Sequence, residues 1–414
     1  MNTQESGVAA TTGALSGLKV IEIASENAAY AGKLLADMGA SVTLVEPPGG
    51  HATRGYGPFA GDVPGPESSL WWWFYNTSKR SVTADLASDR GRQDVTRLIS
   101  DADVVLEGQP VGELAALGLD YDDVRAAHPN LVWASVTPFG RTGTRVHEAA
   151  TDLTLLAAGG PVWSCGYDDH SLPPIRGGGY QSLHIAGVFA AMSVLTALVH
   201  RQSGGGGQLV DVSMYAAANV TTESSSFEWL IGRKTVQRQT GRHALTFATS
   251  DVQVLAGDNK YVTTGFAPNS EGDFAMLLAW LDELGARDDF ETAPFLQMGV
   301  ERGGVNPHAL EDDPLAEQIF ATGRDALVFI ASRLSAYDFF IGAQQRNFQC
   351  GIIYAPEEAL EDVHFVERGF PVQVEHPDLG RSVTYPGAPF KMSATPMRIR
   401  RAPKVGEHDE AGQI

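Results

Sequence analysis

Two adjacent cations are the first residues whose types and position suggest chemistry. Lys79 and Arg80 stand side by side just before a predicted strand at residues 81–85. Such a pair suits a phosphate, because each side chain offers charge-assisted hydrogen bonds and the neighbouring loop backbone can donate more. A solvated basic pair is also common on any protein surface. The pair therefore indicates either an anion site or an ordinary basic surface.

Three carboxylates and one imidazole are the candidates for covalent or acid–base chemistry. His184 is a candidate general acid or base, although a lone His beside an apolar helix is more often a satisfied core or interface residue. Asp152 is interpreted as a cap on the helix that follows it. Glu223 and Glu228 follow a predicted strand, and the sequence does not place them. The His residues are scattered and no Cys-x-x-Cys occurs, so no metal site is predicted.

The elements that must position these residues alternate between strand and helix. Apolar strands at 18–23 and 41–45 flank a helix at 28–38, and further strands are predicted at 103–106 and 131–135. This alternation is typical of a parallel sheet covered by helices. The expected fold is therefore α/β, with a Rossmann-like, doubly wound large domain.

A change in character along the chain predicts a second domain. Residues 1–224 are expected to form the first part of the large domain. Residues 225–330 are expected to form a smaller α+β domain, with a hairpin around residues 256–260. Residues 331–414 are expected to return to the large domain and end in a loop-rich tail. The segment Ser-Gly-Gly-Gly-Gly at 203–207 is interpreted as a turn between a helix and a strand. It is not a phosphate loop, because no Lys-Ser/Thr follows it.

Composition and charge narrow the class of protein. The 414 residues carry a formal net charge of -20, which disfavours a nucleic-acid partner. Cys165 and Cys350 are far apart and give no disulfide framework, which fits a reducing cytosol. Residues 1–16 show no signal-peptide pattern, and the apolar run at 185–199 is too short to span a bilayer. We therefore expect a cytoplasmic protein with no membrane partner.

Several ordered segments together resemble the class III coenzyme A transferases, the family of carnitine dehydratase and formyl-CoA transferase. The likeness covers roughly residues 17–408, nearly the whole chain. The segments that carry it are Leu18–Ile23, Leu34–Ala40 with Val45-Glu46-Pro-Pro-Gly-Gly50, Asn76-Thr-Ser-Lys79-Arg80-Ser81, Ser135-Val-Thr-Pro-Phe139-Gly140, Phe365–Pro396 and Gly406-Glu407-His408.

The resemblance implies a nucleophile that is missing at its expected place. In the family an Asp just before the long apolar helix carries the acyl group as a mixed anhydride. Counting back from Gly187 and from Arg201 puts this position at Ser182 or Leu183, and neither side chain can form an anhydride. No catalytic residue is therefore assigned. A racemase function, as in the related methylacyl-CoA racemases, needs the same Asp and fails for the same reason.

The resemblance also implies ligands and contacts. Coenzyme A or an acyl-CoA is expected as substrate or ligand, with no permanently bound cofactor, and a carboxylic acid is the second substrate. The aromatic run at 71–75 is more often core or interface, although one ring could stack on the adenine or shape an aromatic acyl site. The residues expected to contact the coenzyme are Asn27, Arg54, Asn76, Lys79, Arg80, Phe139 and Gly140.

The predicted function follows from the scaffold and the vacant position. The family forms interlocked dimers, so a dimer is expected. The chain is predicted to be a subunit of a class III CoA transferase, which moves CoA between an acyl-CoA thioester and a carboxylic acid, as the non-catalytic partner of an Asp-bearing paralogue. Two alternatives stay open. One is an active homodimer with a displaced carboxylate, and the other is a CoA-thioester-binding or scaffold protein without turnover.

Overall fold

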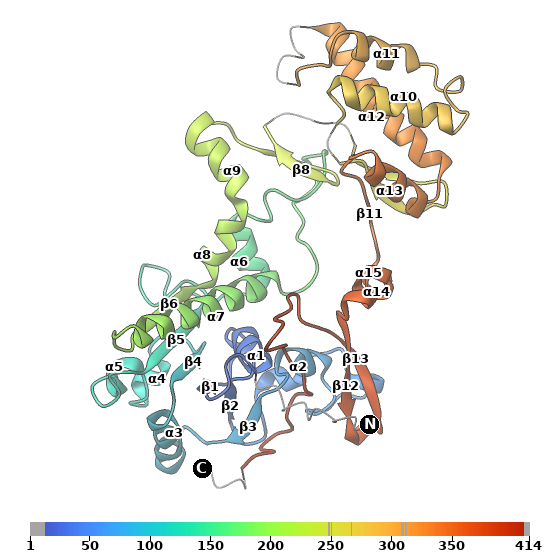
Figure 1. Ribbon diagram of the computed structural model, residues 1–414. Helices are drawn as coiled ribbons and strands as arrows, with labels where there is room; N and C mark the ends of the chain where they lie inside the picture. The colour runs from blue at the N-terminus through green and yellow to red at the C-terminus, as the bar shows by residue number, and fades with distance from the viewer. Residues whose placement is uncertain are drawn as a thin grey trace. The chain divides into compact units, whose positions relative to one another are not determined.

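The computed structural model of the chain describes residues 13–246, 249, 251–265, 267–307, 310 and 313–409 (Figure 1). These residues form two compact units. Unit 1 comprises the described residues within Met1–Trp163, Ile175–Ser226 and Val363–Ile414, and unit 2 comprises those within Ser164–Pro174 and Phe227–Asp362.

Unit 1 is built on a six-stranded parallel sheet with strand order β3-β2-β1-β4-β5-β6, so the α/β class is confirmed. Most strand residues are buried without alternation, as expected where helices cover both faces of a parallel sheet. The strands are β1 (Lys19–Ile23), β2 (Ser41–Glu46), β3 (Arg80–Thr83), β4 (Val104–Glu107), β5 (Val132–Thr137) and β6 (Leu209–Ser213).

Successive strand side chains point to opposite faces and enter two separate cores. Val20 and Leu106 belong to the core that includes α1, α2, α6, α7 and α8. Ile21 and Val105 belong to the core on the other face, which includes α3, α4 and α5. The helices of this unit are α1 (Ala29–Asp37), α2 (Leu70–Tyr75), α3 (Asp89–Ser100), α4 (Glu113–Ala116), α5 (Tyr121–Val124), α6 (Asp152–Gly159), α7 (Gln181–Gln202), α8 (Met214–Asn219), α9 (Glu223–Phe227) and α15 (Val363–Arg368).

Helix α7 packs closely on α1. Gly187 makes this possible, because a Cβ there would lie 2.8 Å from Cδ1 of Tyr30. Ala186, Ala190 and Val194 are buried on the same side of the helix. By length and composition α7 is the one helix of the described chain that could cross a membrane, and half of its apolar window is buried inside the protein.

The tail covers the open side of β3, which is an edge strand. The backbone N–H of Ser81 donates to His408 Nδ1 at 3.2 Å, and the backbone N–H of His408 donates to the Ser81 carbonyl at 3.0 Å. Asp409 accepts from the Thr83 backbone at 2.7 Å. An edge strand that is paired in this way cannot recruit another chain. A separate hairpin of this unit pairs β12 (Pro371–His376) with β13 (Arg381–Pro386).

Unit 2 has its own apolar core and differs in bounds from the predicted small domain. It continues to Asp362, because residues of α12 and α13 share one core with α10. The predicted hairpin around residues 256–260 is confirmed, with Val254 opposite Val262. Its elements are β7 (Gln237–Gln239), β8 (Arg242–Leu245), β9 (Gln253–Leu255), β10 (Tyr261–Thr263), α10 (Glu271–Glu283), α11 (Ala293–Glu301), α12 (Pro314–Arg333), α13 (Ala336–Gln345), β11 (Gly351–Ile352) and α14 (Pro356–Glu361).

Candidate functional site at the carboxyl edge of the sheet

The order of the strands reverses between β1 and β4, and the loops that follow these strands lie together. Ligands of open parallel sheets bind at such a point, outside the carboxyl ends of the strands. Asn27, after β1, donates from Nδ2 to the carbonyl of Gly108, after β4, at 3.1 Å. Gly108 permits this approach, since a Cβ there would lie 2.6 Å from Ser25 Oγ.

A cavity of about 370 Å³ opens at this edge. Its charged groups are two carboxylates, Glu26 and Asp152, and one guanidinium, Arg176. Most of the lining comes from the loops after β1 and β5, from the first turns of α6 and α7 and from the loop before α7. The full lining comprises Glu26, Asn27, Tyr56, Pro138, Ala150, Thr151, Asp152, Leu153, Leu155, Arg176, Tyr180, Ser182, Leu183 and Met214.

Asp152 connects the starts of two helices. Its Oδ1 accepts from the backbone N–H and from the hydroxyl of Ser182, both at 2.8 Å. Its Oδ2 lies 3.1 Å from Nη1 of Arg176, and its side chain is 10% exposed. The N-cap of α7, Tyr180, makes no side-chain cap, so Asp152 serves one of the free N–H groups of that helix.

Asp152 does cap a helix, as predicted, but the helix is α7 and not α6, the helix that directly follows it. Thr151 caps α6, because its hydroxyl accepts from the Thr154 backbone at 3.4 Å. Asp152 lies in the first turn of α6 and caps α7 instead. The signal was present in the Thr151-x-x-Thr154 spacing, but the contact to α7 spans 30 residues and could not be inferred from local sequence.

The two positions at which the sequence places the family's nucleophilic Asp are both buried. Ser182 is 0% exposed and Leu183 is 2% exposed. Ser182 points its hydroxyl at Asp152, and Leu183 packs in the main core of unit 1. A carboxylate is therefore next to this position, but it comes from α6 and its oxygens already accept hydrogen bonds from the protein.

A second hydrogen-bonded pair stands on the cavity wall. The Tyr56 hydroxyl donates to Glu26 Oε2 at 2.9 Å. Burial, followed by the hydrogen bond to Glu26, raises the pKa of Tyr56 to about 12. Tyr56 is therefore a hydrogen-bond donor at neutral pH, and it holds the carboxylate of Glu26 at the cavity wall.

His184 lies among aromatic rings. Its Nε2 is 2.8 Å from the Tyr75 hydroxyl, and its ring centroid is 4.4 Å from that of Tyr30. Burial lowers the pKa of His184, although Asp152 opposes this. A neutral imidazole with a tyrosine partner fits the satisfied core residue better than the acid–base candidate. In the aromatic run, Trp71, Trp72 and Tyr75 are buried, as in a core helix.

Lys79, predicted to contact a phosphate, is enclosed by the protein. Its side chain is 0% exposed and faces Glu22 at 2.8 Å. The three N–H groups of its ammonium have three partners, Glu22, the Ala29 carbonyl and Asn76 Oδ1. Asn76, 1% exposed, serves Lys79 and the Trp72 carbonyl. Both residues build the scaffold.

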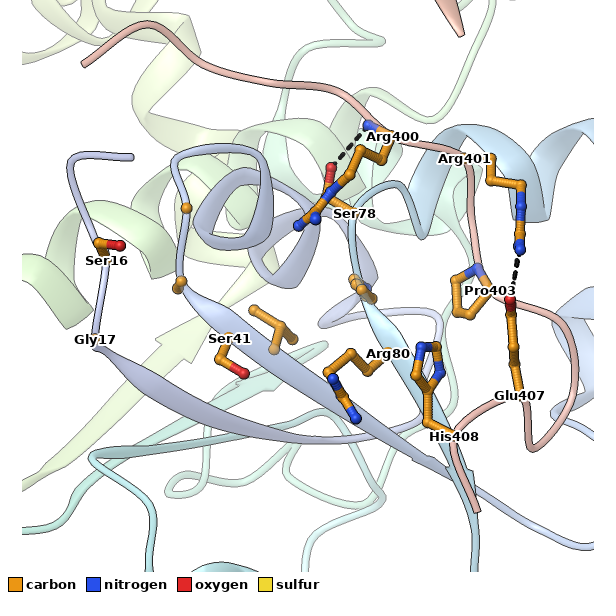
Figure 2. A pocket seen from close by; sticks show the side chains of 14 residues that line it. Ser16, Gly17, Ser41, Ser78, Arg80, Arg400, Arg401, Pro403, Glu407 and His408 are labelled. Carbon is orange, nitrogen blue, oxygen red and sulfur yellow. Dashed lines mark hydrogen bonds and ion pairs between the residues drawn. The ribbon is translucent and has the colours of Figure 1, made fainter. Parts of the chain in front are cut away.

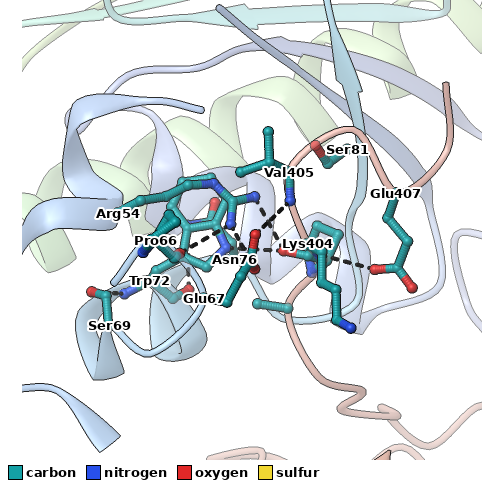
Figure 3. Close-up of polar contacts among 12 residues, drawn as sticks. Arg54, Pro66, Glu67, Ser69, Trp72, Asn76, Ser81, Lys404, Val405 and Glu407 are labelled. Carbon is teal, nitrogen blue, oxygen red and sulfur yellow. Dashed lines mark hydrogen bonds and ion pairs between the residues drawn. The ribbon is translucent and has the colours of Figure 1, made fainter. Parts of the chain in front are cut away.

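Arg54 is likewise a structural crosslink (Figure 3). It pairs with Glu46 through Nε at 2.7 Å and Nη2 at 2.8 Å. Its remaining donors reach Glu67 and the carbonyls of Pro66 and Pro403. The guanidinium also lies 3.7 Å from the centre of the Trp72 ring. All five donors are used inside the protein, so Arg54 joins the tail to the sheet.

The other predicted contacts separate into two places. Asn27 lines the carboxyl-edge cavity, and Phe139 and Gly140 follow its lining residue Pro138. Arg80 lines a different cavity at the amino end of β3. The structure therefore does not bring the seven predicted residues together.

The remaining candidates do not contribute to this site. Glu223, at the start of α9, is exposed and does not line the cavity. Glu228 belongs to unit 2. Over the ranges that the structure describes, no group of three or more His, Cys, Asp or Glu could hold a metal ion. Arg176 and Tyr180 were missed by sequence reasoning, although a cation beside three glycines at 177–179 was a usable signal.

Comparison with known proteins agrees with the sequence resemblance. The model of CoA-transferase family III matches residues 15–409. The succinyl-CoA:(R)-benzylsuccinate CoA-transferase subunit BbsE of Thauera aromatica is 30% identical over 400 residues, covering 94% of this chain and 91% of the relative. The succinate–glutarate CoA-transferase of Agrobacterium fabrum is 29% identical, covering 95% and 93%. The formyl-CoA:oxalate CoA-transferase of Streptomyces coelicolor is 27% identical, covering 97% and 94%.

Solved structures show the same fold. A CAIB/BAIF family protein from Brucella suis superimposes with a TM-score of 0.76 at 25% identity, covering 97% of this chain and 98% of that one. Rv3272 from Mycobacterium tuberculosis, at 23% identity and a TM-score of 0.72, covers 96% and 98% and supports the fold alone.

Proposed function

Because this chain belongs to CoA-transferase family III, we propose that it is a subunit of an enzyme that moves CoA between an acyl-CoA thioester and a carboxylic acid. Within that enzyme it is the non-catalytic partner of an Asp-bearing homologue. The observation that carries this proposal is the enclosed Ser182/Leu183 pair where the family's nucleophile is expected. A relative of 30% identity is itself named a subunit of a CoA-transferase.

The contacts of Asp152 argue against its use as a displaced nucleophile. Carboxylate attack on a thioester needs an oxygen lone pair directed at the carbonyl carbon. Oδ1 of Asp152 is occupied by two donors from Ser182, and Oδ2 faces Arg176. Attack from Oδ1 would break the cap of α7, and attack from Oδ2 would neutralise the carboxylate that pairs with Arg176. Hydrogen bonds to a charged group contribute about 1.5–3 kcal/mol each.

The exposed side of α7 supports a dimeric assembly. Val188, Met192 and Val199 are exposed and follow one another at helical spacing. Contiguous apolar surface on a soluble protein commonly marks an interaction site. We therefore propose that this face, defined by Val188, Met192 and Val199, packs against a homologous subunit in an interlocked dimer.

We place the coenzyme at the carboxyl edge between β1 and β4. Rossmann-like folds bind their ligands at the same point, where the strand order reverses. Of the predicted contacts, Asn27, Phe139 and Gly140 are retained there, while Arg54, Asn76 and Lys79 hold the scaffold. The proposed donor is a dicarboxylyl-CoA such as succinyl-CoA, since relatives acting on benzylsuccinate, citramalate and mesaconate are named as succinyl-CoA-dependent. The division into a large and a small domain and a cytoplasmic location belong to the same proposal.

Purification of the chain alone and after co-expression with an Asp-bearing homologue from the same genome tests the proposal. We expect no CoA transfer from succinyl-CoA to dicarboxylic acids by the chain alone and clear transfer by the mixed complex. Transfer by the chain alone that disappears in Asp152→Asn would establish the displaced carboxylate instead. Coenzyme binding with no turnover in any combination would establish the binding protein.

A further inference from the structure

A second cavity, of about 530 Å³, lies at the opposite edge of the sheet (Figure 2). Ser41 begins β2, Arg80 begins β3, and Gly17 precedes β1, so this is the amino edge. Strands rise roughly 3.3 Å per residue, which puts this edge on the order of 16 Å from the carboxyl edge. A ligand bound here therefore lies at the opposite end of the strands from the carboxyl-edge cavity.

Two guanidinium groups in this cavity lack partners among the described residues. Nε of Arg80 is buried without a hydrogen bond. Arg400 is fixed by its backbone, whose N–H donates to Ser78 Oγ and whose carbonyl accepts from the Ser78 N–H, both at 3.0 Å. Its side chain, which lines the cavity, makes no hydrogen bond or ion pair in the described chain. Arg400 is exposed to solvent, whereas Nε of Arg80 is buried, and natural proteins rarely keep a buried donor without a ligand or water.

The other charges at the cavity are already balanced. Arg401 pairs with Glu407, and Lys79 points away to Glu22. The uncompensated charge therefore belongs to Arg80 and Arg400, in a chain whose net charge is -20. Two positive groups that share one cavity repel each other, and a dianion between them would remove that repulsion.

Neutral donors complete the lining. His408 uses Nδ1 to accept from the Ser81 backbone, so its Nε2 carries the hydrogen in the neutral ring. Burial and the charge of Arg80 both lower the pKa of His408, which keeps this ring neutral until an anion offsets them. Ser16 and Ser41 add hydroxyls to the lining. Guanidinium forks with hydroxyl and imidazole N–H donors are the groups that bind phosphate in proteins.

We propose that the cavity lined by Arg80, Arg400 and His408 binds a phosphate group. Because Arg400 and His408 belong to the tail and Arg80 to β3, a bound phosphate clamps the tail onto the edge of the sheet. The phosphate is either free inorganic phosphate or the phosphomonoester of a larger molecule such as the 3′-phosphate of CoA. The inference does not depend on the proposed function, because it uses neither the nucleophile position nor the carboxyl edge.

Thermal unfolding and calorimetry of the full chain with inorganic phosphate test the proposal. The wild type should gain Tm with phosphate and should gain none with chloride at equal ionic strength, which controls for screening. Arg80→Gln and Arg400→Gln should each weaken phosphate binding at least about tenfold, the loss of one charge-assisted contact. Arg80→Lys keeps the charge and should recover part of the affinity.

The matched control is Arg90→Gln, because Arg90 is 92% exposed and its ion pair is 3.8 Å long. It should leave phosphate binding unchanged. Without phosphate, Arg80→Gln should unfold at no lower Tm than the wild type, since it removes a repelling charge. Unchanged phosphate affinity in both glutamine variants would overturn the proposal, and so would equal weakening by Arg90→Gln.

Two further ligands separate the sources of the phosphate. If CoA but not dephospho-CoA competes with inorganic phosphate for the wild type, the cavity binds the 3′-phosphate. If neither competes, the cavity binds free phosphate independently of the coenzyme. CoA and dephospho-CoA could instead both displace inorganic phosphate, and to the same extent in Arg80→Gln as in the wild type. The phosphate would then be bound outside this cavity, which would contradict the proposal.

Discussion

The carboxylate of Asp152 accepts two hydrogen bonds from one residue, Ser182, through its backbone N–H and its hydroxyl. Through these two bonds the start of α6 fixes the start of α7 beside the carboxyl-edge cavity. An Asp at position 182 would face Asp152 at this short range, so the residue at 182 and the acid at 152 are coupled. This coupling is why a carboxylate could not simply be restored there.

Removal of Asp152 should destabilise unit 1. Asp152→Ala leaves the Ser182 N–H and hydroxyl and the Arg176 guanidinium without their acceptor, and we expect a loss of about 2–3 kcal/mol in the free energy of unfolding. Asp152→Asn keeps an acceptor for Ser182 and should lose only about 1 kcal/mol. Urea unfolding followed by circular dichroism measures both, and equal losses in the two variants would show that capping is unimportant.

The fold should tolerate an acidic residue at position 182 only when residue 152 is neutral. Ser182→Asp brings two carboxylates together in a buried place, which is destabilising by like-charge repulsion. Adding Asp152→Asn should recover about 1–2 kcal/mol of that loss. The four proteins of this double-mutant cycle are compared by urea unfolding, and additive effects would contradict the coupling.

Replacement of Lys79 should affect stability rather than coenzyme affinity. Lys79→Met leaves Glu22 buried without its counter-ion, and breaking a buried pair in this way costs about 3–5 kcal/mol. The sequence resemblance had placed Lys79 among the residues expected to contact the coenzyme. Calorimetry on folded Lys79→Met should instead give unchanged CoA affinity, and a large loss of affinity would restore the earlier interpretation.

The Glu22 carboxyl should make the free energy of unfolding depend on pH, with a sign that follows from its raised pKa. Burial raises its pKa from 4.5 to about 7, against the opposing effect of Lys79. The folded state therefore binds more protons than the unfolded state between these two values, so this group's contribution to stability decreases as the pH rises from 4.5 to 7. Glu22→Gln should remove this slope from the free energy of unfolding measured across the window. An unaltered slope would assign it to other groups.

The exposed face of α7 should control assembly. Met192→Glu places a charge in the centre of that face and should reduce dimer or mixed-complex formation in native mass spectrometry. Val63→Glu is the matched control, since Val63 is a similarly exposed apolar residue in a loop, at 66% exposure. Intact assembly in Met192→Glu would exclude this face as the interface.

Sequence patterns predicted the elements far better than the partners of charged side chains. Apolar runs are enough to identify β1 and β2, because a strand buried on both faces must be apolar almost throughout. Glu22 interrupts such a run, and its partner Lys79 lies 57 residues away. The local sequence around either residue therefore does not indicate that its charge is buried. The contacts of Arg54 could not be inferred from local sequence for the same reason, since one of its partners lies 349 positions away.

The covered edge of β3 has a consequence for synthesis. Ser81 and Thr83 find their partners at His408 and Asp409, more than 320 residues later. While the chain is being made, the sheet of unit 1 can align its first strands, but the outer side of β3 stays open until the last part of the tail leaves the ribosome. The whole of unit 2 is translated in that interval. The nascent sheet therefore keeps a free edge at β3 until the tail covers it, and a free edge of this kind is prone to pair with other chains.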